Sequence, residues 1–325
     1  MEYRRLGRSG LRVSAVSLGS MNMGSWLDRA ASHRVLDAAF DAGINLIDTA
    51  EMYPSPLEAA TQGRSEEVVG AWLEGKPRDA VILATKISGA NRAELGDIVP
   101  HIRGGFAILD WHHFARACEA SLKRLKVDCI DLYQTHWPDR GTPIAAQLEA
   151  FERLIEAGKV RYAGVSNETP WGLMRLLATA ETSGLPRIVA VQNSYSLVRR
   201  DYEAGLAEVC VQEGVGMLPF SPLGEGVLTG KYTGGKIPHD SRFAVYQRGR
   251  ERFGDAKTLA RADAYVDVAR AHGLEPTQMA IAWVKRQPGV ASVISSASNV
   301  GQVASLAAAA DLTLPNETLA AIATV

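Results

Sequence analysis

Eight short apolar runs recur along the chain, and each is followed by a longer segment in which apolar residues have helical spacing. This alternation is typical of βα units, because the strands of a parallel sheet are buried on both faces and read as near-continuous apolar runs. Eight such units form a (β/α)8 barrel, which needs roughly 250 residues or more. The 325 residues therefore predict a single α/β domain, a (β/α)8 TIM barrel over residues 1–325. The runs are residues 15–20, 45–50, 80–86, 129–137, 160–167, 188–195, 216–223 and 291–297.

Three further segments complete the predicted architecture. Residues 3–14, YRRLGRSGLRVS, hold two short stretches around Gly10, and we predict an N-terminal β-hairpin that closes the floor of the barrel. Residues 87–109 and 224–256 are unusually long connections, and both follow the carboxyl end of a predicted strand. Long loops in compact domains usually cover or bind a ligand, and barrels carry their sites at that end. We therefore predict that both loops border a site.

The charge balance points to a small-molecule partner. The chain has 35 basic and 36 acidic residues, so it carries no overall charge that would attract nucleic acid or an anionic membrane. Its N-terminus is charged, and no stretch reaches the ~18 uninterrupted apolar residues of a membrane span. Cys118, Cys129 and Cys210 are widely spaced, which favours free thiols in a reducing compartment. We expect a cytoplasmic protein, and the sequence does not predict its oligomeric state.

Polar side chains occur at the carboxyl ends of several predicted strands. In a parallel barrel these ends converge on one face, so residues far apart in the sequence become neighbours. This topology alone predicts a functional site on that face. The residues are Asp48, Lys86, His136, Asn167, Gln192 and Ser221.

Four residues near these ends have the chemistry for carbonyl reduction. Asp48 and Lys86 lie in apolar surroundings, and we expect them to pair, because a buried ion is tolerated only with a partner. The Tyr53 phenol has an ordinary pKa of ~10, and the Lys86 ammonium would lower that pKa and make the phenol a better acid. His136 is suited to donate a hydrogen bond to a substrate carbonyl. The four supply no reducing power, so a hydride donor must bind.

Each of these residues also has an ordinary structural explanation. Asp48 and Lys86 alone would read as a structural ion pair, and His136 as a core histidine. Tyr53 alone would read as a loop tyrosine that shields the edge of the core. Their convergence at one end of the barrel favours the catalytic interpretation.

The segments that carry these residues resemble, in order, signature segments of the aldo-keto reductases: GINLIDTAEMYP, LATK, YQTHWPD, GVSNE, VQNSYS and FSPLGEGVLTGKY. The similarity runs from Leu6 to about Leu319, and the long loops resemble those of a bacterial branch related to the potassium-channel β subunits. The resemblance implies a (β/α)8 barrel, NADP(H) bound in an extended pose, and interconversion of carbonyls and alcohols. It also implies that the catalytic tetrad is Asp48, Tyr53, Lys86 and His136.

The resemblance further implies a set of cofactor contacts. Those to the nicotinamide fall near strand ends, at Ser20, Met21, Asp48, Ser166, Asn167, Gln192 and Phe220. Those to the pyrophosphate fall in one loop, at Ser221, Pro222, Leu223, Gly224 and Gly226. Lys231 and Arg242 resemble cationic contacts to the cofactor's phosphates. Those to the adenosine end fall at Ser296, Ser298, Asn299 and Gln302.

The adenosine loop departs from the family pattern. Ser296 replaces a glycine, and residues 296–302 contain no arginine or lysine. Ser305 and Leu306 stand where the family usually has Glu-Asn. Hydroxyl and amide side chains in the loop can still donate hydrogen bonds to a 2′-phosphate. We therefore expect NADPH as the cofactor, with NADH as the alternative.

Other classes find less support in the sequence. A Rossmann dehydrogenase needs G-x-G-x-x-G between a strand and a helix, and residues 224–230 lack the third glycine of that spacing. The seven histidines show no HxH or HExxH spacing for a metal, and no GxSxG provides a nucleophilic serine. The alternative from another class is a cofactor-binding regulatory or scaffold subunit with slow turnover.

The substrate itself is not encoded in a motif. Met23, Trp26, Tyr53 and Trp137 predict a partly aromatic pocket suited to aldehydes or flat ketones, although core packing explains the tryptophans equally well. The loops expected to shape this pocket are residues 22–27, 54–63, 88–109 and 224–256.

Overall fold

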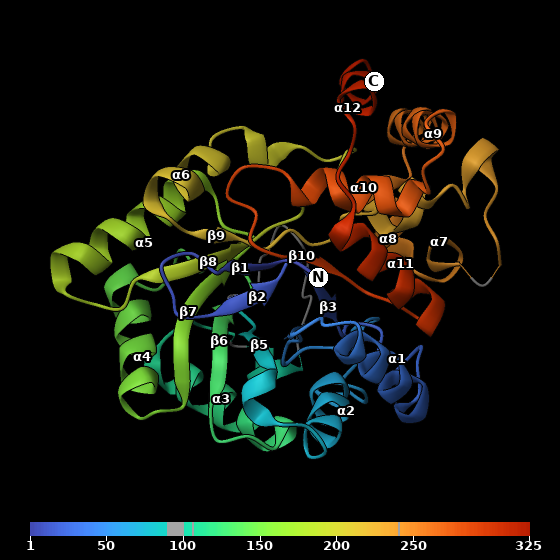
Figure 1. Ribbon diagram of the computed structural model, residues 1–325. Coiled ribbons are helices and arrows are strands. Elements are labelled where there is room, and N and C mark those ends of the chain that lie inside the picture. Colours follow the sequence, from blue (N-terminus) through green and yellow to red (C-terminus); the bar gives the residue numbers. More distant parts are fainter. Residues whose placement is uncertain (90–100, 106, 240) are drawn as a thin grey trace.

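Eight parallel strands form one curved sheet in the computed structural model, which describes residues 1–89, 101–105, 107–239 and 241–325 (Figure 1). Each predicted apolar run holds one of these strands, because a strand buried on both faces needs such a run. The strands are β3 (Val16–Gly19), β4 (Leu46–Asp48), β5 (Ile82–Ile87), β6 (Ile130–Thr135), β7 (Val160–Ser166), β8 (Ile188–Gln192), β9 (Gly216–Met217) and β10 (Val293–Ser295).

The sheet closes into a barrel. Strands β3 to β9 are neighbours in chain order, and β10 pairs in parallel with β3. Between β9 and β10, Met217 N donates to Gly289 O at 2.8 Å, and Ala291 N donates to Met217 O at 2.9 Å. Ile294 N also donates to Pro219 O at 2.8 Å. These hydrogen bonds complete the ring, and the predicted (β/α)8 barrel is confirmed.

Helices surround the barrel in Figure 1. Capping residues in the sequence mark where these helices begin and end. At the start of α5 (Pro170–Ser183), Pro170 takes the first position and the Thr169 hydroxyl accepts a hydrogen bond from Gly172 N. Beyond the end of α4 (Ile144–Glu156), Gly158 adopts a left-handed backbone at φ 69°. The others are α1 (Arg29–Asp41), α2 (Arg64–Leu73), α3 (Trp111–Leu125), α6 (Leu206–Glu213), α7 (Arg242–Val245), α8 (Gln247–Phe253), α9 (Ala256–Ala271), α10 (Pro276–Lys285), α11 (Val300–Asp311) and α12 (Asn316–Ala323).

The predicted N-terminal hairpin is present and closes one end of the barrel. Strands β1 (Tyr3–Arg5) and β2 (Arg12–Ser14) are antiparallel and lie in front of the barrel strands in Figure 1. Leu6, Leu11 and Val13 are buried in one cluster with inward-facing residues of the barrel strands. The Tyr162 hydroxyl of β7 accepts a hydrogen bond from Gly10 N at 3.0 Å. The hairpin therefore seals the amino-terminal end and leaves the site to the other end.

The two long connections differ in how far they can be described. Residues 224–256 carry a 3-10 segment over Gly224–Thr229 and the short helices α7 and α8. Most of the predicted loop 87–109 lies outside the described residues, which here include 87–89, 101–105 and 107–109. Among the helices that are described, none is long and apolar enough to cross a membrane.

Leu6→Ala tests the role of the hairpin as a structural plug. Leu6 is 0% exposed, and removing its buried methyl groups leaves a cavity at the barrel floor, so we expect the free energy of unfolding to fall by about 2–5 kcal/mol. Val211→Ala on α6, at a position that is 51% exposed, serves as the control and should change it by less than about 0.5 kcal/mol. Urea unfolding monitored by tryptophan fluorescence measures both. Equal effects of the two substitutions would contradict the plug.

Candidate active site

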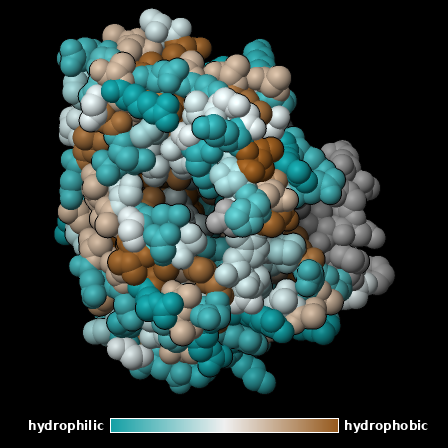
Figure 2. Space-filling model, turned by 90° about the vertical axis from the view of Figure 1, so that its right-hand side faces the viewer, coloured by the Kyte–Doolittle hydropathy of each residue, from teal (hydrophilic) through white to brown (hydrophobic). Residues whose placement is uncertain are grey.

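A cavity of about 1550 Å³ opens at the carboxyl ends of the strands. Its lining includes Asp48, Ser166, Gln192 and Ser295, which are the last residues of β4, β7, β8 and β10. Figure 2 shows a hollow on the side of α7, α9 and α11, with hydrophobic atoms visible inside it. The structure therefore joins residues from most of the chain in one concave site, as a barrel of this topology predicts.

The floor of the cavity rests on a buried ion pair. Lys86 Nζ lies 2.6 Å from Asp48 Oδ2, and the two side chains are 0% and 3% exposed. Lys86 Nζ also donates to Thr49 O at 2.8 Å, and Gln192 Nε2 donates to Asp48 Oδ1 at 2.8 Å. Each charge thus has several partners, which a buried ion requires. The predicted pairing of Asp48 with Lys86 is confirmed.

Two further polar rings line the cavity above this pair. Lys86 Nζ lies 5.1 Å from the centroid of the Tyr53 ring. The His136 ring meets the Tyr53 ring edge to face, with centroids 5.6 Å apart, and stacks on Trp137 at 4.4 Å. Tyr53, His136 and Trp137 all line the cavity. A phenol, an imidazole and an ammonium therefore gather within a few ångströms of a space where a small molecule can lie.

The acidity of Tyr53 differs from the expectation. Burial and the negative charge of Asp48 raise the pKa of the Tyr53 phenol well above its usual value, whereas Lys86 was expected to lower it. The reason is that the Lys86 ammonium is engaged by Asp48, so its charge is largely balanced, and burial lowers the pKa of Lys86 itself. Tyr53 consequently stays protonated at ordinary pH, as a neutral hydrogen-bond donor.

The wall next to the Lys86–Asp48 pair contains the residues expected to hold the nicotinamide. Ser166 Oγ donates to Gln192 O at 2.7 Å, and Asn167 Nδ2 donates to His136 O at 2.9 Å. Asn167 and Ser221 have left-handed backbones, at φ 55° and 52°. Such conformations persist only where the surroundings hold them, and they occur often at binding sites. Phe220 lines the cavity beside them.

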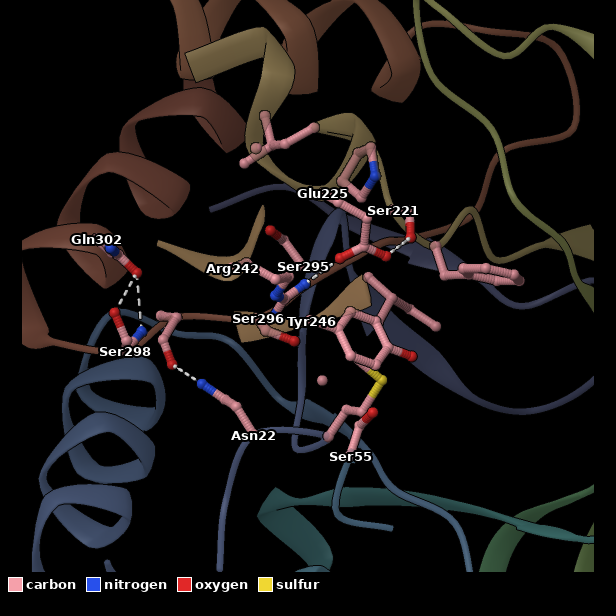
Figure 3. A pocket seen from close by; sticks show the side chains of 18 of the residues that line it. Asn22, Ser55, Ser221, Glu225, Arg242, Tyr246, Ser295, Ser296, Ser298 and Gln302 are labelled. Atoms are coloured by element: carbon pink, nitrogen blue, oxygen red, sulfur yellow. Dashed lines mark hydrogen bonds and ion pairs between the residues drawn. The ribbon is translucent and has the colours of Figure 1, made fainter. Parts of the chain in front are cut away.

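A buried carboxylate lies in the loop expected to hold the pyrophosphate. Glu225, which is 3% exposed, contacts Arg242 Nη1 at 2.6 Å and accepts from Ser221 Oγ at 3.2 Å (Figure 3). It also lies 3.7 Å from Arg252 Nη1. Although burial favours the neutral acid, the two guanidinium groups hold the pKa of the Glu225 carboxyl below its usual value. Lys231 adds another cation to the lining.

The far end of the cavity is polar. Ser298 N and Oγ both donate to Gln302 Oε1, at 2.8 and 3.1 Å, and Asn22 Nδ2 donates to Ala297 O at 2.9 Å (Figure 3). Asn299 caps α11 by accepting from Gln302 N. The side chains and backbone here offer hydrogen-bond donors and acceptors for a polar ligand.

Most of the predicted site residues line this one cavity, and three lie behind its wall. Lys86 is buried beneath the floor, Ser20 is fully buried with its backbone N bonded to Asp48 O, and Gly224 is buried near Val198. Those on the lining are Met21, Asp48, Tyr53, His136, Ser166, Asn167, Gln192, Phe220, Ser221, Pro222, Leu223, Gly226, Lys231, Arg242, Ser296, Ser298, Asn299 and Gln302.

The aromatic pocket expected from the sequence is present in part. Trp26, Tyr53 and Trp137 line the cavity. Met23 does not contribute, because its side chain is fully buried in the main core beneath that loop. The structure also adds Asn22, Glu225 and Arg252, which sequence reasoning missed. The sequence pattern that could have indicated Glu225 is an acidic residue between two glycines, followed further along the chain by several arginines.

Comparison with known sequences gives the family. The family model described as "Aldo/keto reductase family" matches residues 15–325. The chain belongs to the aldo/keto reductase family. Members of this family are NAD(P)H-dependent oxidoreductases, and the chain is an oxidoreductase of this type.

Three relatives illustrate the range of the aldo/keto reductase family around this chain. "Protein tas" of Escherichia coli (strain K12) is 43% identical, covering 99% of this chain and 96% of its own length. "Probable voltage-gated potassium channel subunit beta" of Oryza sativa subsp. japonica is 33% identical, over 93% and 89%. "Versiconal hemiacetal acetate reductase" of Aspergillus parasiticus is 31% identical, over 89% and 86%.

The cavity fits a dinucleotide. Its volume exceeds the ~300–1,000 Å³ of an ordinary small-molecule pocket, as a cofactor and a substrate together require. Lys231 and Arg242 on the lining suit phosphate groups. Gly19 and Gly226 also line it, and a Cβ on Gly226 would lie 2.8 Å from Lys231 Cε. These glycines leave the backbone without side-chain cover on this part of the lining.

Tyr53→Phe tests the raised pKa through stability at high pH. An unfolded tyrosine loses its proton near pH ~10, whereas folded Tyr53 keeps it, so the folded state loses stability as pH rises above ~10. Removing the hydroxyl should make this loss shallower by about 1.4 kcal/mol per pH unit. Urea unfolding from pH 8 to 11 measures the slopes. Below pH ~9.5 the two proteins should differ by a constant amount; parallel curves at every pH would contradict the raised pKa.

Proposed function

We propose that this protein reduces an aldehyde or ketone to the alcohol with NADPH, using Tyr53 as the proton donor. The observation that supports this most is the gathering of Tyr53, His136 and the Lys86–Asp48 pair at the floor of one cavity. These groups can receive a carbonyl oxygen as it gains negative charge. Donors placed where charge develops usually contribute more to catalysis than any other single effect.

When bound, NADPH supplies the hydride that adds to the carbonyl carbon. Tyr53 gives its phenolic proton to the carbonyl oxygen, and the C=O bond becomes C–O with both added hydrogens accounted for. His136 donates a hydrogen bond that orients the same oxygen. The phenolate left on Tyr53 is stabilised by the Lys86 ammonium, 5.1 Å from the ring centroid, until it takes a proton from water. Asp48 keeps Lys86 charged in its buried position.

Residues along the cavity would hold the cofactor in an extended pose. Ser166, Asn167 and Gln192 would bind the carboxamide, and Phe220 would stack on the nicotinamide ring, with Met21 beside it and Ser20 behind the wall at this point. The pyrophosphate would lie against Ser221, Pro222, Leu223 and Gly226, with Gly224 behind them in the same loop. Lys231 and Arg242 would contact the cofactor's phosphates. Ser296, Ser298, Asn299 and Gln302 would contact the adenosine end.

NADPH is the cofactor we propose, with NADH as the alternative. Lys231, Arg242 and two further arginines on the lining favour the additional charge of a 2′-phosphate, whereas residues 296–302 bring no cation. Fluorescence titration with each dinucleotide decides between them. The aromatic side chains of Trp26, Tyr53 and Trp137 favour aldehydes or flat ketones as substrates. We place this activity in the cytoplasm and on a small molecule.

A cofactor-binding regulatory subunit with slow turnover is the second candidate, favoured by the 33% identity to a probable channel subunit. A single-turnover experiment separates the two functions. NADPH bound to the protein is mixed with a panel of carbonyls, and its absorbance is followed. Oxidation by any of them supports the reductase, whereas unchanged absorbance across the panel leaves only the binding function.

Tyr53→Phe should lower kcat for carbonyl reduction by about 10²–10⁴-fold, because the proton donor is lost. The Kd for NADPH should stay within about twofold of the wild-type value, because the hydroxyl acts on the substrate alone. Tyr162→Phe is the matched control, since that hydroxyl bonds Gly10 at the opposite end of the barrel. Steady-state kinetics and fluorescence titration supply the two values. Turnover retained in Tyr53→Phe would exclude Tyr53 as the donor.

Lys231→Met should raise the Kd for NADPH about tenfold, equivalent to ~1.4 kcal/mol, by removing a cation from the phosphates. Lys126→Met, at the end of α3 where Lys126 pairs with Glu74, removes the same charge away from the cavity and should leave the Kd unchanged. The measurement is fluorescence titration at two salt concentrations. Equal Kd values for both variants would remove Lys231 from the cofactor site.

A further inference from the structure

A second buried ion pair lies beside the catalytic floor. Arg103 Nη1 contacts both carboxylate oxygens of Glu51, at 2.8 and 2.7 Å, and the two side chains are 7% and 4% exposed. Arg103 has a left-handed backbone at φ 48°. Burying two charges and holding a left-handed backbone both cost folding free energy, and such features often occur where they serve a function. This pair lies next to Tyr53.

The Arg103 guanidinium joins the two segments that carry the catalytic side chains. Glu51 lies two residues before Tyr53, and Ser88 lies two residues after Lys86. Arg103 Nη2 donates to Ser88 O at 2.8 Å, while Ser88 N donates to Glu51 Oε1 at 2.5 Å. One guanidinium therefore holds the turn after β4 against the end of β5. Lysine cannot reproduce this arrangement, because it lacks the planar fork of donors.

The same segment packs on the catalytic tyrosine. Ile102 is buried in an apolar cluster with Ala50 and Met52, against which Tyr53 and Trp137 pack. Ile102 thus makes apolar contacts with the turn at residues 50–53, and the neighbouring Arg103 makes an ion pair with it. One backbone hydrogen bond also joins this turn to β5, from Glu51 N to Lys86 O at 3.1 Å. The neighbouring backbone hydrogen bond, from Thr49 N to Ala84 O, measures 2.9 Å.

We propose that Arg103 is a positioning residue, which acts through Glu51 and Ser88 to hold the Tyr53 hydroxyl in register with Lys86 and His136. This inference rests on the proposed function. Displacement of a reacting group by about 1 Å typically costs ~10²-fold in rate, even when the displacing change lies away from the chemistry. The contribution of Arg103 is therefore to the rate of proton transfer, and its loss leaves cofactor binding in place.

Arg103→Lys is the first test variant. It keeps the positive charge beside Glu51 and loses the simultaneous contact with Ser88. We expect kcat to fall about 10–100-fold while the Kd for NADPH changes less than twofold. In the cofactor-free protein, the amides of Glu51, Tyr53 and Ser88 should exchange with deuterium at least about tenfold faster.

A double variant and its two single substitutions keep the test decisive. The double variant Arg103→Met with Glu51→Gln leaves no unpaired buried charge, so it remains interpretable if Arg103→Met alone does not fold. The fall in kcat of the double variant should match that of Arg103→Met or Arg103→Lys. It should be smaller than the sum of the falls caused by Arg103→Met and Glu51→Gln alone, because Arg103 and Glu51 act as one unit. Additive effects of the two substitutions would overturn the proposal.

Arg78→Lys is the matched control. Arg78 binds buried Asp131 at 2.7 Å and two backbone carbonyls, and it lies before β5, at the opposite end of the barrel. This variant should lose stability without changing kcat or exchange at residues 49–53. Exchange in Arg103→Lys equal to wild type would overturn the proposal at any level of activity. So would faster exchange with unchanged kcat. A wild-type protein that binds NADPH but reduces no carbonyl would instead contradict the proposed function. Amide hydrogen exchange would still show whether Arg103 holds the turn at residues 50–53.

Discussion

The ion pair between Lys86 and Asp48 lies where water does not reach, and the surrounding structure is arranged to satisfy it. Its charges cost free energy to bury, and the short contact between them offsets this cost, together with hydrogen bonds to Thr49, Gln192 and Gln134. Asp48 and Lys86 lie on the neighbouring strands β4 and β5, Thr49 follows β4, and Gln192 ends β8, so the full set of partners assembles only in the folded barrel. The site and the fold therefore depend on the same hydrogen bonds.

This pair also sets the chemistry of Tyr53. If Lys86 stood alone, its charge would draw the phenol toward ionisation; because Asp48 balances it, burial wins and the pKa of Tyr53 rises. A phenol with a raised pKa has a proton to give but is a weaker acid, so its proton transfer depends on the ammonium below it, which stabilises the phenolate as it forms. In the proposed reaction, Asp48 balances the charge of Lys86 while Tyr53 is protonated, and Lys86 stabilises the phenolate once Tyr53 has given up its proton.

A similar balance recurs in the loop expected to hold the pyrophosphate. Glu225 holds Arg242 and Arg252 around a buried carboxylate, so part of the positive charge expected for phosphate binding is already paired. Membership in the aldo/keto reductase family establishes an oxidoreductase, whereas its relatives range from a named reductase to a probable channel subunit. Loops such as the one that carries Glu225 generally vary more within a family than the scaffold does.

The barrel was predictable because each strand is specified locally: a strand buried on both faces needs a continuous apolar run, and eight runs with helical segments between them leave few other folds. The pairing of Asp48 with Lys86 was also predictable, since buried ions need partners. What the sequence by itself determined was thus the barrel, its hairpin plug and the strand ends that meet. Only the tertiary structure decided that the pKa of Tyr53 rises, that Ser20 and Gly224 lie behind the wall, and that Arg103 reaches Glu51 across 52 residues. Those outcomes depend on burial and on distances between segments far apart in the chain, which no local pattern encodes.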